Sequence, residues 1–297
     1  MFRKIHVAGR PACLRSAARA LSLSIALMGA TGIHAAAERP VSSLVIDAGD
    51  GATIYASDAG VVRAPASLTK MMTLFLVFDA LDARTLRIDE RITMSRHAAA
   101  QQPSKLGLGA GRSLPLKLAI QAVAVDSAND VAVALAERVG GSEEAFARRM
   151  TQKAQALGLT DTRFANATGL TSRGNRTTAH DIARLSRAML RDHPRDYRYF
   201  SARSLRWDNR TLANHNHLLG KVPGVDGIKT GYTVDAGYNL AASAKRRGRR
   251  VIAVVMGERS AASRDVRVAN LLERAFEAGT TRRPARRGAR NARGRSG

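Results

Sequence analysis

Ser67 and Lys70 lie three residues apart, a spacing that can bring a weak nucleophile and a base together. Positions three apart share one face of a helix, so on a helix the Lys70 amine would lie beside the Ser67 hydroxyl. Pro65 just before this pair and the largely apolar run 71–78 after it predict that a buried helix begins here. The positive end of that helix's dipole would also stabilise an oxyanion. The pair therefore indicates nucleophilic catalysis, although a serine three residues before a lysine also occurs by chance.

Two later polar stretches strengthen this interpretation. Ser127 and Asn129 lie in the break 126–130 between two predicted helices, and Lys229-Thr230-Gly231 lies on a predicted strand. Taken alone, the polar residues of the break would be expected to cap the helix that follows. However, serine-x-x-lysine, Ser-x-Asn and Lys-Thr-Gly in this order are the mark of penicillin-binding proteins and class A β-lactamases. The three motifs together predict a single site of serine acylation.

The elements that must position these motifs follow from the hydrophobic periodicity. Strands are expected over five stretches: 42–46, 52–56, 225–232, 239–244 and 251–256. Helices are expected after Ser67 and over five further stretches: 114–125, 131–139, 142–157, 178–190 and 264–278. The predicted fold class is α/β in its α+β form. We expect an antiparallel sheet built from both ends of the chain, flanked by helices, with residues about 88–190 inserted as a helical subdomain.

The chain resembles the D-alanyl-D-alanine carboxypeptidases, which are low-molecular-mass penicillin-binding proteins and serine peptidases. The resemblance covers residues 40–278 and rests on four signature-like stretches: 67–73, 127–137, 162–170 and 225–240. It implies the β-lactamase/transpeptidase-like fold. It also implies a hydrolase that removes the terminal D-alanine from peptidoglycan stem peptides and acts in cell wall biogenesis and cell shape.

The resemblance assigns a role to each catalytic residue. Ser67 would attack the carbonyl of the penultimate D-alanine and form an acyl-enzyme that water then releases. Lys70 would be the base, because burial and the charge of Lys229 both lower the pKa of its amine. Ser127 would pass a proton to the departing amine, and Asn129 would orient Lys70 and the substrate amide.

The resemblance also indicates how the substrate is bound. The backbone amides of Ser67 and Tyr232 would form the oxyanion hole. The free carboxylate of the substrate would meet Lys229-Thr230-Gly231 and Arg259, since arginine can bind a carboxylate through two hydrogen bonds. The alternative for Arg259 is one more surface arginine in a basic chain. β-Lactams, which resemble the D-Ala-D-Ala end, would be covalent inhibitors.

Other functions stay open beside this one. Soluble relatives in the same family include D,D-endopeptidases that cut cross-bridges, and this is the main alternative activity. A class A β-lactamase would need a Glu-x-x-Leu-Asn stretch between Asn129 and Lys229, which the sequence lacks. A nucleic-acid-binding protein or a non-catalytic wall-binding module is opposed by the complete motif set. No cofactor or metal is predicted, because His215 and His217 lack a third ligand at a suitable spacing.

Half of the net charge of +24 lies at the two ends of the chain, and the middle carries the other half. Residues 1–37 contain five basic and no acidic side chains. The basic residues precede an apolar stretch, and Ala35-Ala36-Ala37 follows that stretch. This pattern predicts a signal peptide over 1–37 and hence an exported protein, periplasmic or associated with the cell envelope. The only cysteine, Cys13, lies in the part that would be removed.

A catalytic domain over 38–279 and a disordered tail over 280–297 complete the predicted organisation. Residues 282–297 contain seven arginines and no acidic side chain. We expect this tail to stand in place of the second β-rich domain and membrane-binding helix that many members of the family carry. An electrostatic contact with anionic membrane or wall polymer is its predicted role, a solvated tail without a partner is the alternative, and no nucleic-acid partner is predicted.

Overall fold

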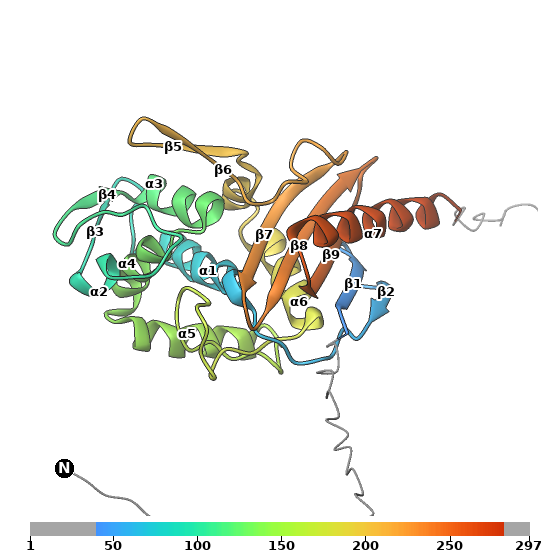
Figure 1. Cartoon of the computed structure of the whole chain (residues 1–297), viewed down its shortest axis with the longest axis horizontal. Helices are drawn as coiled ribbons and strands as arrows, with labels where there is room; N and C mark the ends of the chain where they lie inside the picture. The colour runs from blue at the N-terminus through green and yellow to red at the C-terminus, as the bar shows by residue number, and fades with distance from the viewer. Residues whose placement is uncertain (1–39, 282–297) are drawn as a thin grey trace, which may run out of the picture. The chain divides into compact units, whose positions relative to one another are not determined.

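The computed structural model describes residues 40–281, so the predicted signal peptide and the arginine-rich segment 282–297 lie outside the described residues. Its centre is a five-stranded antiparallel sheet in the order β2-β1-β9-β8-β7 (Figure 1). The strands are β1 (Ser42–Asp47), β2 (Thr53–Ser57), β7 (Val225–Thr233), β8 (Gly237–Arg246) and β9 (Arg249–Glu258). The prediction that both ends of the described chain build one antiparallel sheet is therefore confirmed.

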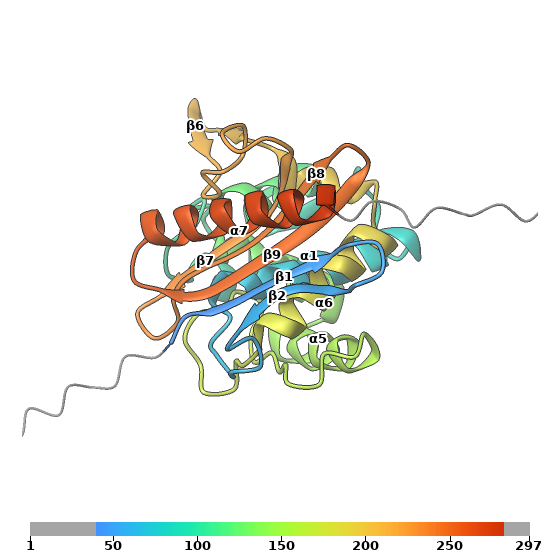
Figure 2. The ribbon, with the colours of Figure 1, turned by 90° about the vertical axis from the view of Figure 1, so that its right-hand side faces the viewer.

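Alternation along the central strands gives the sheet two buried faces. In β9, Val251, Ala253 and Val255 pack with α7 (Ala261–Thr281), which lies across one face of the sheet (Figure 2). The intervening residues of the same strand, Ile252, Val254 and Met256, belong to the larger core on the other face. A shift of one residue would exchange the two sets, so packing on both faces fixes the register.

Two helices on that second face carry much of the larger core. Helix α1 (Thr69–Asp82) follows a 3-10 turn over Ala66–Leu68 and is buried on almost all sides. Helix α6 (Ala179–Asp192) packs against β1 and β9. This corrects the expected helical subdomain of about 88–190, because its last helix belongs to the layer that covers the sheet. Among residues 40–281, the structure contains no helix with the length and apolar character needed to cross a membrane.

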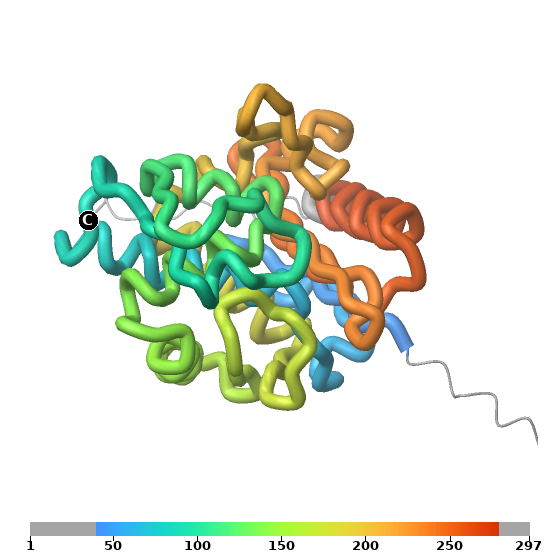
Figure 3. Tube along the Cα trace, turned by 60° about the vertical axis from the view of Figure 1, so that its left-hand side comes forward, coloured from blue at the N-terminus to red at the C-terminus, as the bar shows by residue number. Residues whose placement is uncertain are grey.

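The helical part beside the sheet comprises residues 96–156 (Figure 3). Its helices are α2 (Arg96–Ala99), α3 (Leu116–Gln121), α4 (Asn129–Gly140) and α5 (Glu143–Ala156), and a π-helical turn over Ala122–Asp126 follows α3. The helix expected over 114–125 begins later than predicted. Its first residues form β4 (Ser113–Pro115), which pairs with β3 (Arg91–Thr93), so that Leu114 lies opposite Ile92.

A hairpin that the sequence analysis does not predict lies between α6 and β7. A 3-10 turn over Asp196–Ser201 leads into β5 (Ser204–Trp207), which pairs with β6 (Arg210–Ala213). The two residues at its tip, Asp208 and Asn209, have φ values of 47° and 58°. Two consecutive left-handed residues are typical of the tight turns that join antiparallel strands.

Candidate functional site

The three motifs meet around one cavity of ≈ 370 Å³. Ser67 lines it from the 3-10 turn that leads into α1, while Ser127 and Asn129 line it from the break between the π turn and α4. Thr230-Gly231-Tyr232 forms the wall contributed by β7. The structure thus gathers motifs from distant parts of the sequence at the boundary between the sheet and the helical part.

Lys70 lies beside Ser67, as their spacing predicts. Its Nζ is 3.0 Å from Ser67 Oγ, and it also donates to Asn129 Oδ1 and to the carbonyl oxygen of Thr168, each at 2.7 Å. The side chain is fully buried in the turn-and-helix junction. Three oxygens at hydrogen-bond distance therefore fix the position of the amine next to the serine.

The environment of Lys70 favours its neutral form. Burial is the main cause that holds the pKa of its amine well below the ordinary value, and the positive charge of Lys229 lowers this pKa further. The charge of Asp126 acts in the opposite direction but does not outweigh these effects. A neutral amine beside a hydroxyl can accept the proton of that hydroxyl, so the geometry suits a general base.

Lys229 is buried behind the cavity wall and is itself perturbed. Burial lowers the pKa of its amine to about 7, the charge of Asp126 opposes this effect, and Arg264 adds to it. The Nζ of Lys229 donates to the carbonyl oxygen of Thr230 at 3.2 Å. Lys229 therefore lowers the pKa of Lys70, while its own pKa is lowered mainly by burial.

Ser127 presents a free hydroxyl to the site. Its backbone is left-handed, with a φ of 63°, where the π turn ends and before α4 begins. Its Oγ is buried and makes no hydrogen bond to any residue within 40–281. Because a buried polar group without a partner is costly, a hydroxyl held in this way is poised to bond a ligand or transfer its proton.

The amide of Asn129 is oriented by the loop before α3. Its Nδ2 donates to the carbonyl oxygens of Gln102 at 2.9 Å and Pro103 at 3.1 Å, which directs Oδ1 toward Lys70. Helix α4 has no side-chain cap at Ala128. Asn129 is therefore a ligand of Lys70 rather than the helix cap that the polar break alone would suggest.

The loop 162–170 packs against the turn that carries Ser67 and against the start of α1. Thr73 donates to the carbonyl oxygen of Ala167 at 2.7 Å, and the next carbonyl, that of Thr168, receives Lys70. Gly169 has a φ of 78°, and a Cβ there would lie 1.8 Å from the carbonyl oxygen of Ala66. This position must therefore be glycine for the loop to contact the turn that carries Ser67.

Strand β7 also approaches this turn closely. A Cβ on Gly231 would lie 3.0 Å from the backbone nitrogen of Ser67. On the neighbouring strand, Asn239 Nδ2 donates to the carbonyl oxygens of Ala64 and Pro65 at 3.2 Å each. These contacts bring the backbone of β7 to the amide of Ser67, where an oxyanion hole would need it.

Two tyrosines and an arginine other than the predicted Arg259 also line the cavity. Tyr232 stacks on Tyr238 with 4.2 Å between ring centroids, and both side chains line the cavity. Arg259 is exposed and is not among the residues that line this cavity, so its predicted place in the pocket is not supported. Arg264, only 3% exposed, lines the cavity instead. The helix begins at Ala261, and its first turn directs Arg264 rather than Arg259 into the site.

His215 and His217 also line the cavity, which the sequence analysis did not predict. Burial lowers the pKa of His215 to about 4, and the charge of Lys229 adds to this effect, so the ring is neutral near pH 7. Within residues 40–281 there is no group of three or more His, Cys, Asp and Glu side chains arranged to hold a metal ion. The signal in the sequence is the polar cluster 214–217, which lies in the loop between β6 and β7.

The chain matches the model of the D-alanyl-D-alanine carboxypeptidase family over residues 30–260. It is 37% identical over 243 residues to the D-alanyl-D-alanine carboxypeptidase DacF of Bacillus subtilis, an alignment that covers 79% of this chain and 61% of that protein. The chain thus spans about 61% of the length of this curated relative.

Solved structures agree with the sequence comparison. The D-alanyl-D-alanine carboxypeptidase DacD from Francisella tularensis superposes with a TM-score of 0.78 at 32% identity, covering 79% of this chain and 70% of that one. Penicillin-binding protein D2 from Listeria monocytogenes, in its cefotaxime-bound form, gives 0.73 at 32% identity, covering 79% and 96%. The predicted transpeptidase-like fold and the predicted resemblance are both confirmed.

Proposed function

Because the chain belongs to the D-alanyl-D-alanine carboxypeptidase family, we propose that it is a serine peptidase that removes the terminal D-alanine from peptidoglycan stem peptides. The observation that carries this proposal is the fully buried Lys70, with its Nζ 3.0 Å from Ser67 Oγ. A buried amine with a lowered pKa can activate a serine near neutral pH. The free hydroxyl of Ser127 in the same cavity supplies a second group for proton transfer.

The reaction proceeds through an ester on Ser67. Ser67 Oγ attacks the carbonyl carbon of the penultimate D-alanine while its proton passes to Lys70 Nζ. As the peptide bond breaks, Ser127 gives its proton to the departing amine and regains one from Lys70, and terminal D-alanine leaves. Water then attacks the ester while Lys70 Nζ accepts one of its protons. Lys70 returns this proton to Ser67 Oγ as the ester bond breaks, which releases the shortened peptide and restores the Ser67 hydroxyl. Asn129 keeps the Lys70 amine in place throughout.

The carboxylate end of the substrate lies toward the cationic side of the cavity. Arg264 lines this side, and Lys229 lies behind it on β7. Thr230, Gly231 and Tyr232 on the same strand bind the substrate backbone, and the backbone amides of Ser67 and Tyr232 stabilise the oxyanion. Arg264 replaces Arg259 as the arginine of this subsite, because only Arg264 faces the cavity.

β-Lactams should occupy the same site and acylate Ser67. The Listeria relative in its cefotaxime-bound form has the same fold as this chain. A β-lactam keeps its leaving amine tethered, so its acyl-enzyme persists. Since peptidoglycan lies outside the cytoplasmic membrane, this function places the protein in the periplasm or elsewhere in the cell envelope, in keeping with the expected export signal.

Mass spectrometry of defined peptides tests the proposal. The chain without residues 1–37 is incubated with a pentapeptide monomer and with a cross-linked dimer. Loss of one D-alanine from the monomer is the expected product, whereas cleavage of the dimer alone would establish the endopeptidase alternative. No change in either peptide, in a preparation that unfolds cooperatively, would contradict the proposal.

A further inference from the structure

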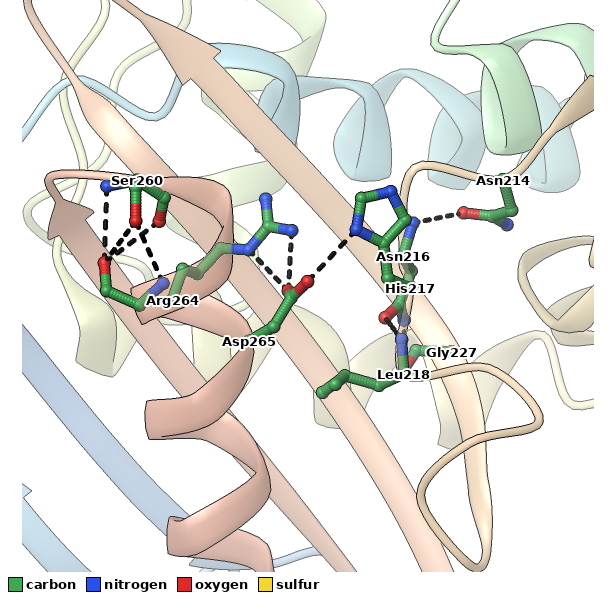
Figure 4. Close-up of polar contacts among 9 residues, drawn as sticks. Asn214, Asn216, His217, Leu218, Gly227, Ser260, Arg264 and Asp265 are labelled. Carbon is green, nitrogen blue, oxygen red and sulfur yellow. Dashed lines mark hydrogen bonds and ion pairs between the residues drawn. The ribbon is translucent and has the colours of Figure 1, made fainter.

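Arg264 is held at the cavity by the residue next to it. Its Nε and Nη2 donate to Asp265 Oδ1 at 2.9 and 2.6 Å (Figure 4). Its Nη1 makes no hydrogen bond to any side chain or backbone group within residues 40–281. One carboxylate oxygen thus fixes two nitrogens of the guanidinium and leaves the third available to a ligand in the cavity.

This pairing is not what the helix alone would produce. Adjacent residues on a helix do not face each other, so the two side chains meet only if Asp265 leans toward Arg264. A third side chain holds Asp265 in that position. Its second oxygen, Oδ2, lies 3.1 Å from His217 Nδ1, which comes from the loop before β7 (Figure 4).

The loop that carries His217 is itself fixed. Asn214 Oδ1 accepts from the backbone nitrogen of Asn216 at 2.8 Å, and Asn216 Nδ2 donates to the carbonyl oxygen of Gly227 on β7 at 3.0 Å (Figure 4). A continuous set of contacts therefore joins β7, which carries Lys229, to the first turn of α7. The two elements that supply the cationic side of the cavity are bridged by His217 and Asp265.

We propose that Asp265 and His217 are positioning residues that hold the Arg264 guanidinium where it can bind the terminal carboxylate of the substrate. This inference rests on the proposed function, because it assigns a role in the same site. Without Asp265 the guanidinium is free to rotate away, and affinity for the carboxylate falls. The atoms around Ser67 stay in place, so the effect appears in KM and not in kcat. A purely structural role would instead lower stability or the fraction of active enzyme.

Steady-state kinetics on an N-acylated peptide ending in D-Ala-D-Ala, with its C-terminal amide as the second substrate, tests this role. For the free carboxylate we expect Asp265→Ala to raise KM about tenfold and to change kcat less than about twofold. His217→Ala should act in the same direction but less strongly, and Asp265→Glu should restore part of the loss. KM for the amide peptide should stay the same. An unchanged KM, or an equal change for both peptides, would overturn the proposal.

Glu273→Ala is the matched control, because it breaks another arginine–carboxylate pair, between Glu273 on α7 and Arg246 on β8. Glu273 lies 2.6 Å from Arg246 on the part of the helix beyond the cavity-lining first turn. We expect it to leave KM and kcat for both peptides unchanged. His217 is 56% exposed, so its replacement tests the bridge even if Asp265→Ala fails to fold.

A binding measurement separates this inference from the proposed function. Calorimetry in a Ser67→Ala background compares the affinity for the carboxylate peptide with that for the amide peptide. The carboxylate should bind more tightly, and Asp265→Ala should remove that preference. If the enzyme with Ser67 hydrolyses neither peptide, the proposed function fails and this measurement still decides the inference. Equal affinities for the two peptides in the Ser67→Ala protein would overturn it.

Discussion

The chemistry of the site depends on a lysine whose surroundings disfavour its charged form. Lys70 has three oxygens within hydrogen-bond distance of its amine, none of them from a carboxylate, and the positive charge of Lys229 acts on it. Burial makes its proton costly, and Ser67 is the hydroxyl that can exchange protons with it. Removing Ser67 should therefore abolish acylation, whereas removing Lys70 should slow it.

Labelling with a fluorescent penicillin tests this division of roles. Ser67→Ala should give no covalent adduct, because the attacking oxygen is gone. Lys70→Ala should form the same adduct at a rate lower by about 10²–10⁴-fold, the usual contribution of a positioned base. Gel fluorescence against time measures both, and circular dichroism checks the fold. An adduct that survives in Ser67→Ala would show that another residue is the nucleophile.

The pH dependence of acylation should report the two coupled lysines. The neutral form of Lys70 is the active one, so the limiting acylation rate rises with pH and reaches its plateau below the ordinary lysine value of 10.5. The charge of Lys229 lowers the pKa of Lys70, so Lys229→Met should raise that pKa and move the midpoint to higher pH. Stopped-flow acylation at saturating β-lactam measures the midpoint. Lys117→Met, at an exposed position of α3, should leave it in place, and an unchanged midpoint in Lys229→Met would contradict the coupling.

The sequence alone predicts site residues that belong to a recognisable motif. It does not predict residues that reach the cavity only because the fold brings distant segments together. Ser67, Ser127 and Lys229 could be assigned from motif order. Arg264 could not, because only the exact start of α7 decides which arginine faces the cavity. His217 is similar, since its partner Asp265 lies 48 positions along the chain and no local pattern connects them.

At the scale of elements, the site depends on how closely a loop and a strand approach the turn before α1. Gly169 must be glycine, because a Cβ there would overlap the carbonyl of Ala66, and Gly231 leaves only a tight space against the amide of Ser67. These contacts explain why the strands and helices were predictable while their junctions were not. Periodicity identifies the buried faces of helices and strands. How closely two segments approach each other at a junction depends instead on which positions are glycine.

Replacement of Gly169 by alanine should therefore be much more harmful than replacement of another left-handed glycine. Gly158 has a φ of 75° and open space around it, whereas Gly169 has a φ of 78° and lies against Ala66. Both substitutions carry the roughly 1–2 kcal/mol cost of a left-handed alanine. Only Gly169→Ala adds a steric clash, which we expect to bring its total above about 3 kcal/mol and to lower β-lactam labelling.

Urea unfolding of both variants measures this difference as the change in transition midpoint at constant slope. Because the left-handed cost is common to the two, the difference between them isolates the contact with the turn. Equal destabilisation would mean that the loop 162–170 moves away without cost, and that it does not fix the position of Ser67.

The β5–β6 hairpin and α6 show the limits of local patterns for whole elements. The hairpin is short and polar, and its turn is Asp208-Asn209 rather than a glycine-containing pair, so the usual signal was weak. The helix 179–192 was predicted correctly as a helix. Its contact with the sheet, however, is a property of the assembled fold, because it depends on β1 and β9 being neighbours.

At the scale of the whole molecule, the catalytic unit depends on strands from the two ends of the described chain. β1 pairs with β9, and α7 covers the face of the sheet that both strands contribute to. Shortening the chain within α7 would uncover this face, since Leu272 and Ala275 are buried there. Any test of the segment beyond α7 must therefore keep the chain at least to Thr281.

The arginine-rich segment 282–297 is proposed to tether the enzyme electrostatically to an anionic membrane or wall polymer. Its seven arginines and lack of acidic residues concentrate positive charge at one end of a chain whose net charge is already +24. Each basic residue near an anionic membrane contributes about 1 kcal/mol of attraction, and the attraction falls as salt shortens the Debye length from about 10 Å at 0.1 M.

Sedimentation compares the chain without residues 1–37 with a version that also ends at Thr281. We expect the longer protein to pellet with anionic vesicles or isolated wall at low salt, and to be released as salt rises. The shorter one should stay in the supernatant, and neutral vesicles should pellet neither. Turnover of a small soluble peptide should be the same for both, because every residue proposed to act in the reaction precedes this segment in the sequence. Equal pelleting of the two proteins at every salt concentration would refute the tether and leave the segment without a role in attachment.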